Sequence, residues 1–240
     1  MSDEAHERWQ GTTTALGGRS DYKRVWDRQA AEYDVASLAV GGFIGEDTLE
    51  RRAEATIETL RAIVGIRPND VILEIGCGIA RVGKPLSHLC LHWVGADISG
   101  EMLKHARRRL EGCGNTTLVE LATVGLQELP SDSFDLVYCT IVFMHLFEWD
   151  RYRYVQEAFR VLTPGGRAYF DNFPLDSDHG WQIFTQGAQY TLGRRPAHLS
   201  MSSSREELRT YLSRAGFERI RIDDLPNGLI SVSGHKAAAA

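Results

Sequence analysis

The sequence predicts an α/β protein built on a doubly wound, mostly parallel sheet. From residue 71 onward, short β-rich apolar runs alternate with segments of helical periodicity, an order typical of a parallel sheet covered by helices on both faces. A glycine turn at 76–78 directly follows the first of these runs. Near the end of the chain the alternation stops, and two apolar runs joined by Pro226-Asn227-Gly228 predict an antiparallel hairpin.

Composition supports one globular domain. The chain has 240 residues, of which 43% are hydrophobic and 25% charged, and this length is enough to bury a full core. No apolar run approaches the roughly 18 residues that a membrane helix needs. The net charge is −5, so the basic surface expected of a nucleic-acid-binding protein is missing. The cysteines are scattered without a CxxC pair and the N-terminus lacks the pattern of a signal peptide, which together predict a cytoplasmic protein.

Residues 1–45 are predicted to form an N-terminal arm and a lid helix. After a polar stretch rich in Gly and Thr, Ser20 is expected to cap a helix that carries Tyr22, Trp26 and Tyr33 at helical spacing. Such aromatic faces can close over a positively charged ligand. A helix that is merely packed on the domain is the alternative.

The core is predicted over residues 46–172. A helical stripe begins at about Glu46 and ends at Gly65. The strands expected after it are 71–75, 92–96, 117–119, 134–138 and 167–170. The helices expected between them are 81–89, 99–111 and 150–162, the last closed by Thr163-Pro164-Gly165-Gly166.

The remaining chain divides into a cap and the end of the core. Residues 173–203 are too many for a plain connection between a strand and a helix, and their aromatic side chains favour a cap insertion over an inert one. Residues 204–235 are predicted to supply a helix at 204–215 and a hairpin of strands 217–223 and 229–233. Residues 236–240 are expected to be a frayed tail.

The glycine turn predicts a ligand site. Gly76 and Gly78 let the backbone pass close to a ligand at the carboxyl end of the first strand. Asp97 follows the next strand at the distance expected of a carboxylate that hydrogen-bonds ribose hydroxyls. A nicotinamide dinucleotide would need a third glycine where Arg81 stands, and the acid Glu74 would repel its pyrophosphate but suits a cationic ligand. An NAD(P)-dependent oxidoreductase is therefore the weaker interpretation.

Four motifs in order carry a family resemblance: Glu-Ile-Gly-Cys-Gly at 74–78, Val-Gly-Ala-Asp-Ile-Ser at 94–99, Leu-Pro-Ser-Asp-Ser-Phe-Asp-Leu-Val-Tyr-Cys at 129–139 and Arg-Val-Leu-Thr-Pro-Gly-Gly at 160–166. Together they resemble the class I S-adenosylmethionine-dependent methyltransferases, in particular the small-molecule enzymes. The resemblance implies a Rossmann-like seven-stranded sheet in order 3-2-1-4-5-7-6 with strand 7 antiparallel. It implies S-adenosylmethionine (SAM) as cofactor and S-adenosylhomocysteine (SAH) as product.

The resemblance also implies a cofactor site, residue by residue. The motif at the first strand would line the methionine and ribose portion, the acid after the second strand would bind the ribose, and the end of the fourth strand would border the sulfonium. The cofactor-binding set so implied, with the lid aromatics added, is Tyr22, Trp26, Tyr33, Glu74, Gly76, Cys77, Gly78, Asp97, Ile98, Met102, Gly125, Leu126, Cys139 and Thr140. Gly125 stands where many members carry an acid, so it and Leu126 can offer the adenine only backbone groups.

Three residues are candidate catalytic bases. His145 follows the fourth strand and titrates near neutrality, Asp171 ends the fifth strand, and His179 lies in the cap. Each has a structural alternative: a pocket-lining His, an ordinary acid at a strand end, or a cap residue. The reaction needs chiefly alignment and exclusion of water, so a base helps only if the acceptor has a proton to lose.

The resulting expectation is an enzyme that methylates an oxygen, or less readily a nitrogen, of a small molecule such as a secondary metabolite, sugar or lipid head group. A catalytically silent SAM- or SAH-binding module is the alternative. No metal site is expected, because His88, Cys90 and His92 alternate without a fourth ligand nearby. The expected assembly is a monomer or a homodimer.

Overall fold

The computed structural model describes residues 21–41, 45–191 and 199–239. The polar arm and the predicted cap residue Ser20 lie outside these ranges. Among the described residues, no helix is both long and apolar enough to cross a membrane.

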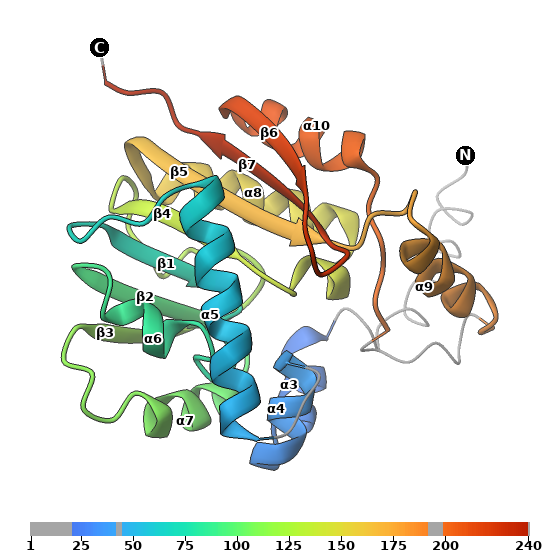
Figure 1. The fold of residues 1–240 in the computed structure, drawn as a ribbon, viewed down its shortest axis with the longest axis horizontal. Coiled ribbons are helices and arrows are strands. Elements are labelled where there is room, and N and C mark those ends of the chain that lie inside the picture. Colours follow the sequence, from blue (N-terminus) through green and yellow to red (C-terminus); the bar gives the residue numbers. More distant parts are fainter. Residues whose placement is uncertain (1–20, 42–44, 192–198, 240) are drawn as a thin grey trace, which may run out of the picture.

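A single sheet organises the molecule, and its seven strands stand in the order β3-β2-β1-β4-β5-β7-β6 (Figure 1). The first five run parallel, while β7 pairs antiparallel with both β5 and β6. The strands are β1 (Val71–Ile75), β2 (His92–Asp97), β3 (Thr116–Glu120), β4 (Phe134–Cys139), β5 (Leu162–Asn172), β6 (Glu218–Asp224) and β7 (Ile230–His235). The predicted order, the antiparallel strand and the hairpin are therefore confirmed.

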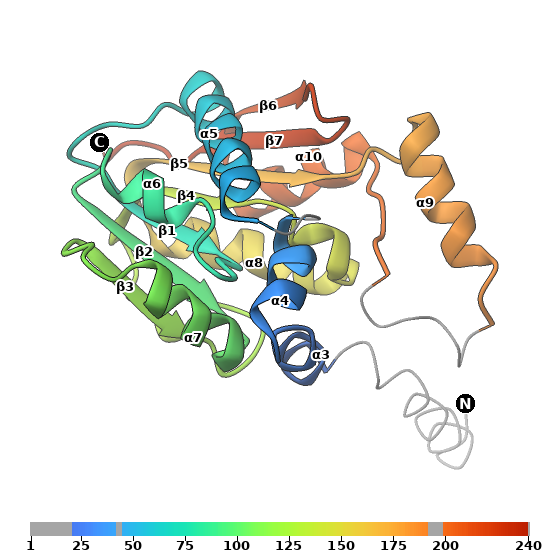
Figure 2. The same cartoon turned by 60° about the horizontal axis from the view of Figure 1, so that its bottom comes forward.

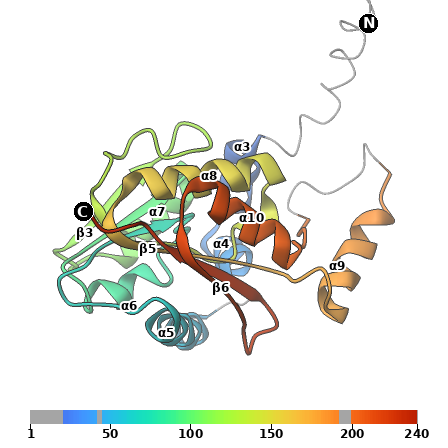
Figure 3. The ribbon, with the colours of Figure 1, turned by 90° about the horizontal axis from the view of Figure 1, so that it is seen from above.

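Helices cover both faces of the sheet (Figure 3). Those on one face are α5 (Glu46–Ile63), α6 (Gly83–Ser87) and α7 (Gly100–Arg109), and those on the other are α8 (Glu148–Val161) and α10 (Arg205–Ala215). Alternate strand residues supply the two cores: Ile72 packs with α5 to α7, while its neighbour Leu73 packs with α8 and α10. This doubly covered sheet explains why the strands read as continuous apolar runs.

Within residues 21–41, the described part of the N-terminal segment, two helices stand where the sequence predicts one. Helix α3 (Tyr22–Gln29) is capped by Asp21, whose side chain accepts from the backbone N–H of Arg24, and a second helix, α4 (Tyr33–Gly41), begins after a short bend. Both helices lie near the carboxyl ends of the strands (Figure 2). Tyr33 consequently starts a new helix and does not extend the face formed by Tyr22 and Trp26.

The start of β5 and the end of the chain differ in detail from expectation. The motif Thr163-Pro164-Gly165-Gly166 does follow the end of α8, but it belongs to β5, which begins at Leu162 and not at residue 167, and the hydroxyl of Thr163 donates to the carbonyl of Phe134. At the end of the chain, the side chain of Lys236 donates to the side chain of Asp132 and to the carbonyl of Leu162, and the N–H of Gly165 donates to the carbonyls of Lys236 and Ala237. Residues 236 and 237 are therefore bonded to the core, which the expectation of a frayed tail did not include.

The described residues of the predicted cap, 173–191 and 199–203, contain one helix, α9 (Asp178–Ala188), which stands apart from the sheet in all three views (Figures 1, 2 and 3). Trp181 and Phe184 stack on each other on α9, with ring centroids 5.2 Å apart, and both are exposed. The described ends of the cap pair with each other, since Ser203 donates its N–H to Phe173 and accepts from Leu175. The cap is thus closed at its base and projects outward.

Candidate active site

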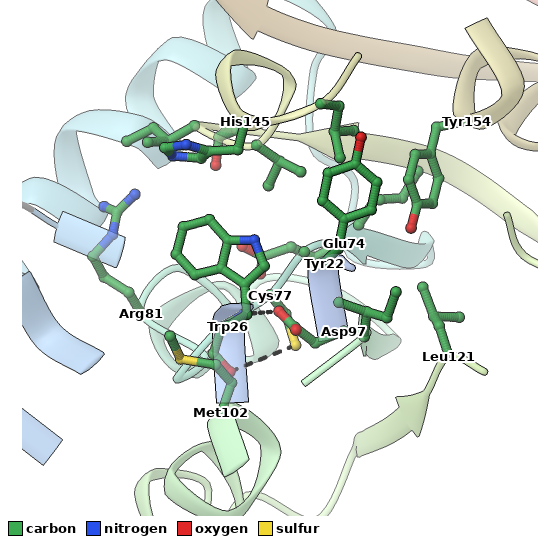
Figure 4. Close-up of a pocket in the computed structure, with 18 residues that line it drawn as sticks. Tyr22, Trp26, Glu74, Cys77, Arg81, Asp97, Met102, Leu121, His145 and Tyr154 are labelled. Carbon is green, nitrogen blue, oxygen red and sulfur yellow. Dashed lines mark hydrogen bonds between the residues drawn. The ribbon is translucent and has the colours of Figure 1, made fainter. Parts of the chain in front are cut away.

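A cavity of about 820 Å³ opens at the carboxyl ends of β1, β2 and β4 (Figure 4). This is the point where the chain crosses to opposite faces of the sheet, through α6 and α7 on one side and α8 on the other. Open α/β sheets bind ligands at such a switch point.

The loop after β1 brings its backbone to the cavity. Gly76 and Gly78 have φ angles of 69° and 53°, in the left-handed region that favours glycine. A Cβ atom on Gly76 would lie 2.4 Å from the side chain of Val142, so the close approach of the two loops also needs glycine there. Ala80 shares the left-handed conformation with a φ of 58°.

Asp97, at the end of β2, hydrogen-bonds the loop after β1 through its side chain. One carboxylate oxygen accepts from the backbone N–H of Gly78 at 2.8 Å and the other from the N–H of Ser99 at 2.8 Å. Burial raises the pKa of Asp97 to about 6, because its effect exceeds that of the backbone donors, which favour the charged form and lower the pKa. The backbone N–H of Ile98 also stabilises the charged carboxylate, and because a carboxylate offers about four acceptor sites, the group can still accept from a ligand.

Glu74 is the second buried acid of the cavity. Its carboxyl group accepts a 2.5 Å hydrogen bond from the phenol of Tyr138, which in turn accepts from the indole of Trp93. Burial raises the pKa of Glu74 to about 8. A cationic ligand would restore the ionised form of this carboxyl, because an opposite charge nearby lowers the pKa of an acid.

The loop after β4 forms the opposite wall with Thr140, Ile141 and Val142. Ile141 has a φ of 61°, which is strained for a β-branched residue. Its backbone N–H donates to Asp171 at 2.7 Å, and burial raises the pKa of this carboxyl to about 7. Asp171 therefore holds the wall of the cavity in place from β5.

His145 and two aromatic residues of α3 complete the cavity. His145 lies on a short 3₁₀ turn, η2 (Phe143–His145), and its ring meets that of Trp26 edge-on with centroids 4.8 Å apart. Tyr22 and Trp26 line the cavity across from the strand ends (Figure 4). The structure thus brings α3 over the site.

The turn η2 is fixed by a buried arginine. Arg151 on α8 is 1% exposed and donates from Nε to the carbonyl of Phe143 at 2.8 Å. Its Nη1 donates to Ser203 at 2.7 Å and to Glu207 at 3.0 Å. Met201 donates its backbone N–H to Met144 at 2.7 Å, so the base of the cap is bonded directly to the turn.

The predicted site residues divide into two groups. The ones that line the cavity are Tyr22, Trp26, Glu74, Gly76, Cys77, Gly78, Asp97, Ile98, Met102, Thr140 and His145. The ones that lie outside its lining are Tyr33, Gly125, Leu126, Cys139, Asp171 and His179.

Asp171 bonds the backbone of Ile141, and four of the other outlying residues also have defined surroundings. The hydroxyl of Tyr33 donates a hydrogen bond to Glu46 and accepts one from Arg109. Leu126 is buried and donates its backbone N–H to Glu157. The ring of His179 packs on that of Phe173 in the cap. Cys139 is fully buried under the end of β4, where burial raises the pKa of its thiol.

Sequence reasoning did not assign Ile75, Arg81, Leu121, Ile141, Val142, Leu146 and Tyr154, which also line the cavity. In the sequence, Arg81 indicates only that the third glycine of a dinucleotide site is missing, although a charged side chain just past the turn is itself a signal. The apolar residues carry no such signal, because they read as ordinary core. In the described part of the chain, no three His, Cys, Asp or Glu side chains are grouped so as to hold a metal ion.

Comparison with known proteins finds methyltransferases similar to this chain. The family model described as "Methyltransferase domain" matches residues 73–170, the segment that builds most of the cavity. The ubiquinone/menaquinone biosynthesis C-methyltransferase UbiE of Vibrio vulnificus is 25% identical over 229 residues, covering 87% of this chain and 84% of that protein. Phosphoethanolamine N-methyltransferase 1 of Arabidopsis thaliana is 26% identical over 133 residues, 55% of this chain, and the match spans only 26% of the plant enzyme.

Solved structures share the fold. A Haloferax volcanii methyltransferase, solved with the Trm112 activator, superposes with a TM-score of 0.67 at 17% identity, covering 88% of this chain and 97% of that one. Magnesium protoporphyrin IX methyltransferase of Synechocystis, solved with bound SAH, gives a TM-score of 0.61 at 15% identity and covers 94% of this chain and 100% of its own.

Proposed function

The chain belongs to the class I SAM-dependent methyltransferases, and from this premise we propose that it transfers a methyl group to an oxygen or nitrogen of a small molecule bound beside His145. The observation that carries the proposal is the juxtaposition, in one cavity, of the loop 76–78, the acid Asp97 and His145. The first two suit the cofactor, and the third faces the space that remains for an acceptor.

The residues present fit SAM. We assign Asp97 to the ribose hydroxyls, because both its oxygens are held in place by backbone donors and the carboxylate can still accept from a ligand. Glu74 offers a buried carboxyl to the cationic portion, and the left-handed turn at Gly76 lets the ligand approach the backbone. Bound SAM supplies a methyl group already activated on its sulfonium.

The remaining task of the chain is alignment. We propose that Trp26 and Tyr22 cover the site from α3 and exclude water, and that the Ile141 wall, held by Asp171, fixes the direction of approach. His145 is proposed to take the proton that an oxygen or nitrogen acceptor loses.

The domain assignment follows from this arrangement. Residues 46–172 and 204–235 are proposed as the cofactor-binding core, with the helix α3 of the segment 1–45 as its lid. Residues 173–203 are proposed as the cap that selects the acceptor, because the base of the cap is bonded to the turn that carries His145.

Two experiments test the proposal. Calorimetric titration with SAH and with NAD should show binding of SAH alone; binding of NAD alone would instead support an oxidoreductase. Release of SAH from SAM should then be followed with a panel of phenols, amines and a quinol. A carbon acceptor is the second candidate, since the UbiE relatives are named as C-methyltransferases. Binding of SAH without turnover on any acceptor would favour the catalytically silent module.

A further inference from the structure

Ile141 carries strained backbone between β4 and the turn η2. In the described chain, the residues other than glycine that have a positive φ are Ala80, Asp132, Ile141 and Arg219, and Ile141 is the only β-branched one among them. A branched Cβ makes the left-handed region costly, so this conformation persists only where the surroundings impose it. Such residues gather at functional sites, and Ile141 lines the cavity.

The side chain of Asp171 imposes the conformation of Ile141. The backbone pairing of β4 with β5 ends at Cys139 and Phe170. Beyond this pair, the carboxyl of Asp171, the next residue of β5, accepts the N–H of Ile141 at 2.7 Å. Asp171 is 4% exposed, so an unpaired N–H or carboxyl here would be costly. The carboxyl thus replaces the sheet hydrogen bond that the turning chain no longer makes.

The conformation of Ile141 sets the direction in which η2 leaves the sheet. The next residue, Val142, has φ −112° and ψ −43°, and its carbonyl accepts the backbone N–H of His145 at 2.9 Å. The side chain of Val142 packs on Gly76, where a Cβ atom would lie 2.4 Å from it. The turn is therefore closed on the residue next to Ile141, and a rotation of the backbone at Ile141 would move His145 with it.

The position of His145 matters for the proposed reaction. Its ring lies at the cavity beside the indole of Trp26, with centroids 4.8 Å apart (Figure 4). A base must lie within hydrogen-bond reach of the proton that it takes, and a displacement of about 1 Å can cost about 100-fold in rate. We propose that Asp171 is a positioning residue, which holds Ile141 in the left-handed conformation and thereby aims His145 at the acceptor. The inference rests on the proposed function, because it takes His145 as the residue that receives the proton.

Asp171 does not need its charge for this role. Burial raises the pKa of Asp171 to about 7, and the N–H of Ile141 and the charge of Arg81 offset this effect only in part. The ionised and the protonated carboxyl both keep an oxygen that can accept from Ile141. An amide offers the same oxygen but cannot serve as a base, so Asp171→Asn separates positioning from catalysis.

The first test reads the position of His145 without an acceptor. In NMR spectra of protein with isotope-labelled histidine, the ring signal of His145 is identified by its absence from His145→Ala, and the indole of Trp26 makes its chemical shift sensitive to displacement. We expect the signal to move in Asp171→Ala and to stay in Asp171→Asn. Asp135→Ala is the matched control, because Asp135 also accepts a backbone N–H, that of Val71 at 2.8 Å, at the opposite end of the sheet. It should leave the signal in place.

The second test addresses the strain itself. Glycine takes the left-handed conformation without steric cost, so Asp171→Ala is compared in the wild-type and the Ile141→Gly backgrounds. In the wild-type background it should lower kcat about 10- to 100-fold on the acceptor that the panel identifies, while the affinity for SAH is retained. In Ile141→Gly the same change should cost less than about 3-fold and leave the His145 signal where Ile141→Gly alone has it. If Asp171→Ala does not fold, folding restored by Ile141→Gly supports the proposal and continued failure contradicts it.

Three results would overturn the proposal. An unmoved His145 signal in Asp171→Ala would show that the carboxyl does not position the turn. Loss of kcat in Asp171→Asn with the signal in place would make Asp171 itself the base. Equal effects of Asp171→Ala in both backgrounds would show that the strain at Ile141 plays no part. A wild-type protein that does not bind SAH, or turns over no acceptor, would instead defeat the proposed function, and the His145 signal would still decide whether Asp171 holds the turn.

Discussion

Tyr22 donates its phenolic hydrogen bond to Asp150 at 2.6 Å and thereby joins α3 to α8 beside the pocket. The same oxygen accepts the backbone N–H of Phe147 at 3.1 Å. At the other side of the pocket, Asp27 of α3 accepts from the hydroxyl of Ser99, the residue that caps α7. Because α3 is held on both sides of the cavity, we expect exchange of the cofactor to require that one of these attachments opens.

The first prediction concerns this attachment. Tyr22→Phe keeps the ring that lines the pocket and removes both hydrogen bonds of the hydroxyl. We expect SAH to dissociate about 3- to 10-fold faster, since net hydrogen bonds of this kind contribute about 0.5–1.5 kcal/mol each. Surface plasmon resonance measures the dissociation rate directly.

The matched control is Tyr190→Phe, which removes a hydroxyl from an exposed tyrosine just after α9 in the cap. It should leave the dissociation rate unchanged. Equal rates for Tyr22→Phe and the wild type would mean that α3 does not control exchange.

The second prediction tests the ribose assignment. Asp97→Asn keeps one acceptor oxygen for the loop, whereas Asp97→Ala removes both acceptors of the Gly78 and Ser99 N–H groups. We expect calorimetry to show SAH affinity in the order wild type, Asn, Ala, with a loss of about 1–3 kcal/mol for Ala. Adenosine, which shares the ribose, should lose affinity in the same order. Unchanged affinity for both ligands would refute the assignment.

Much of the fold was predictable because local patterns and tertiary structure agree. The apolar run 71–75 and the glycine turn after it predict β1 and its loop, and the structure has the strand at Val71–Ile75. The boundary of α3 was not predictable from the aromatic spacing, because the bend before Tyr33 depends on contacts of that residue with Glu46 and Arg109. Those partners are distant in sequence. Propensity alone therefore favoured one continuous helix.

The lining of the cavity was predictable where a residue type carries chemistry. The residue type and sequence position of Gly76, Asp97 and His145 indicate a ligand site, and all three residues line the cavity. Leu121 and Tyr154 line it too, but apolar residues at strand ends and on helices look the same whether they face a core or a ligand. Asp171 shows the reverse case. Its position at a strand end indicates a site residue, but it lies outside the lining of the cavity and its carboxyl accepts a hydrogen bond from the backbone N–H of Ile141.

The third prediction follows from the buried acid Glu74, whose pKa rises from an ordinary value of 4.5 to about 8 through burial. Below pH 4.5 the carboxyl is protonated in both the folded and unfolded states. Between pH 4.5 and 8 the folded state retains a proton that the unfolded chain has released, so Glu74 lowers the free energy of unfolding as pH rises, by up to about 1.4 kcal/mol per pH unit.

Glu74→Gln should therefore lose less stability than the wild type between pH 5.5 and 7.5, as measured by urea unfolding without ligand. Glu50→Gln, the same change at an exposed position of α5, should follow the wild-type slope. If all three proteins show parallel slopes, Glu74 does not titrate in this interval.

The fourth prediction separates the two candidate histidines. His145 lines the cavity, whereas His179 is exposed on α9 and lies outside the lining. His145→Ala should lower kcat by about 100-fold or more if the side chain is the base, with little change in SAH affinity. His179→Ala should leave kcat near the wild-type value. Loss of turnover in His179→Ala alone would move the base into the cap.

The last prediction concerns the junction of the cap with the turn that carries His145. The hydroxyl of Ser203 accepts from Arg151 at 2.7 Å and from Asn172 at 2.8 Å, and both groups are buried. Ser203→Ala removes this acceptor of the buried Asn172 amide and leaves Nη1 of Arg151 with Glu207 alone, so we expect a loss of about 1–3 kcal/mol in the free energy of unfolding.

If the junction also positions the turn, Ser203→Ala should raise the KM of the acceptor while the affinity for SAH stays constant, because the cofactor side of the pocket is built by other loops. Ser213→Ala on the exposed side of α10 is the control and should change neither quantity. A variant that is less stable but has an unchanged acceptor KM would show that the junction holds the fold together without contributing to acceptor binding.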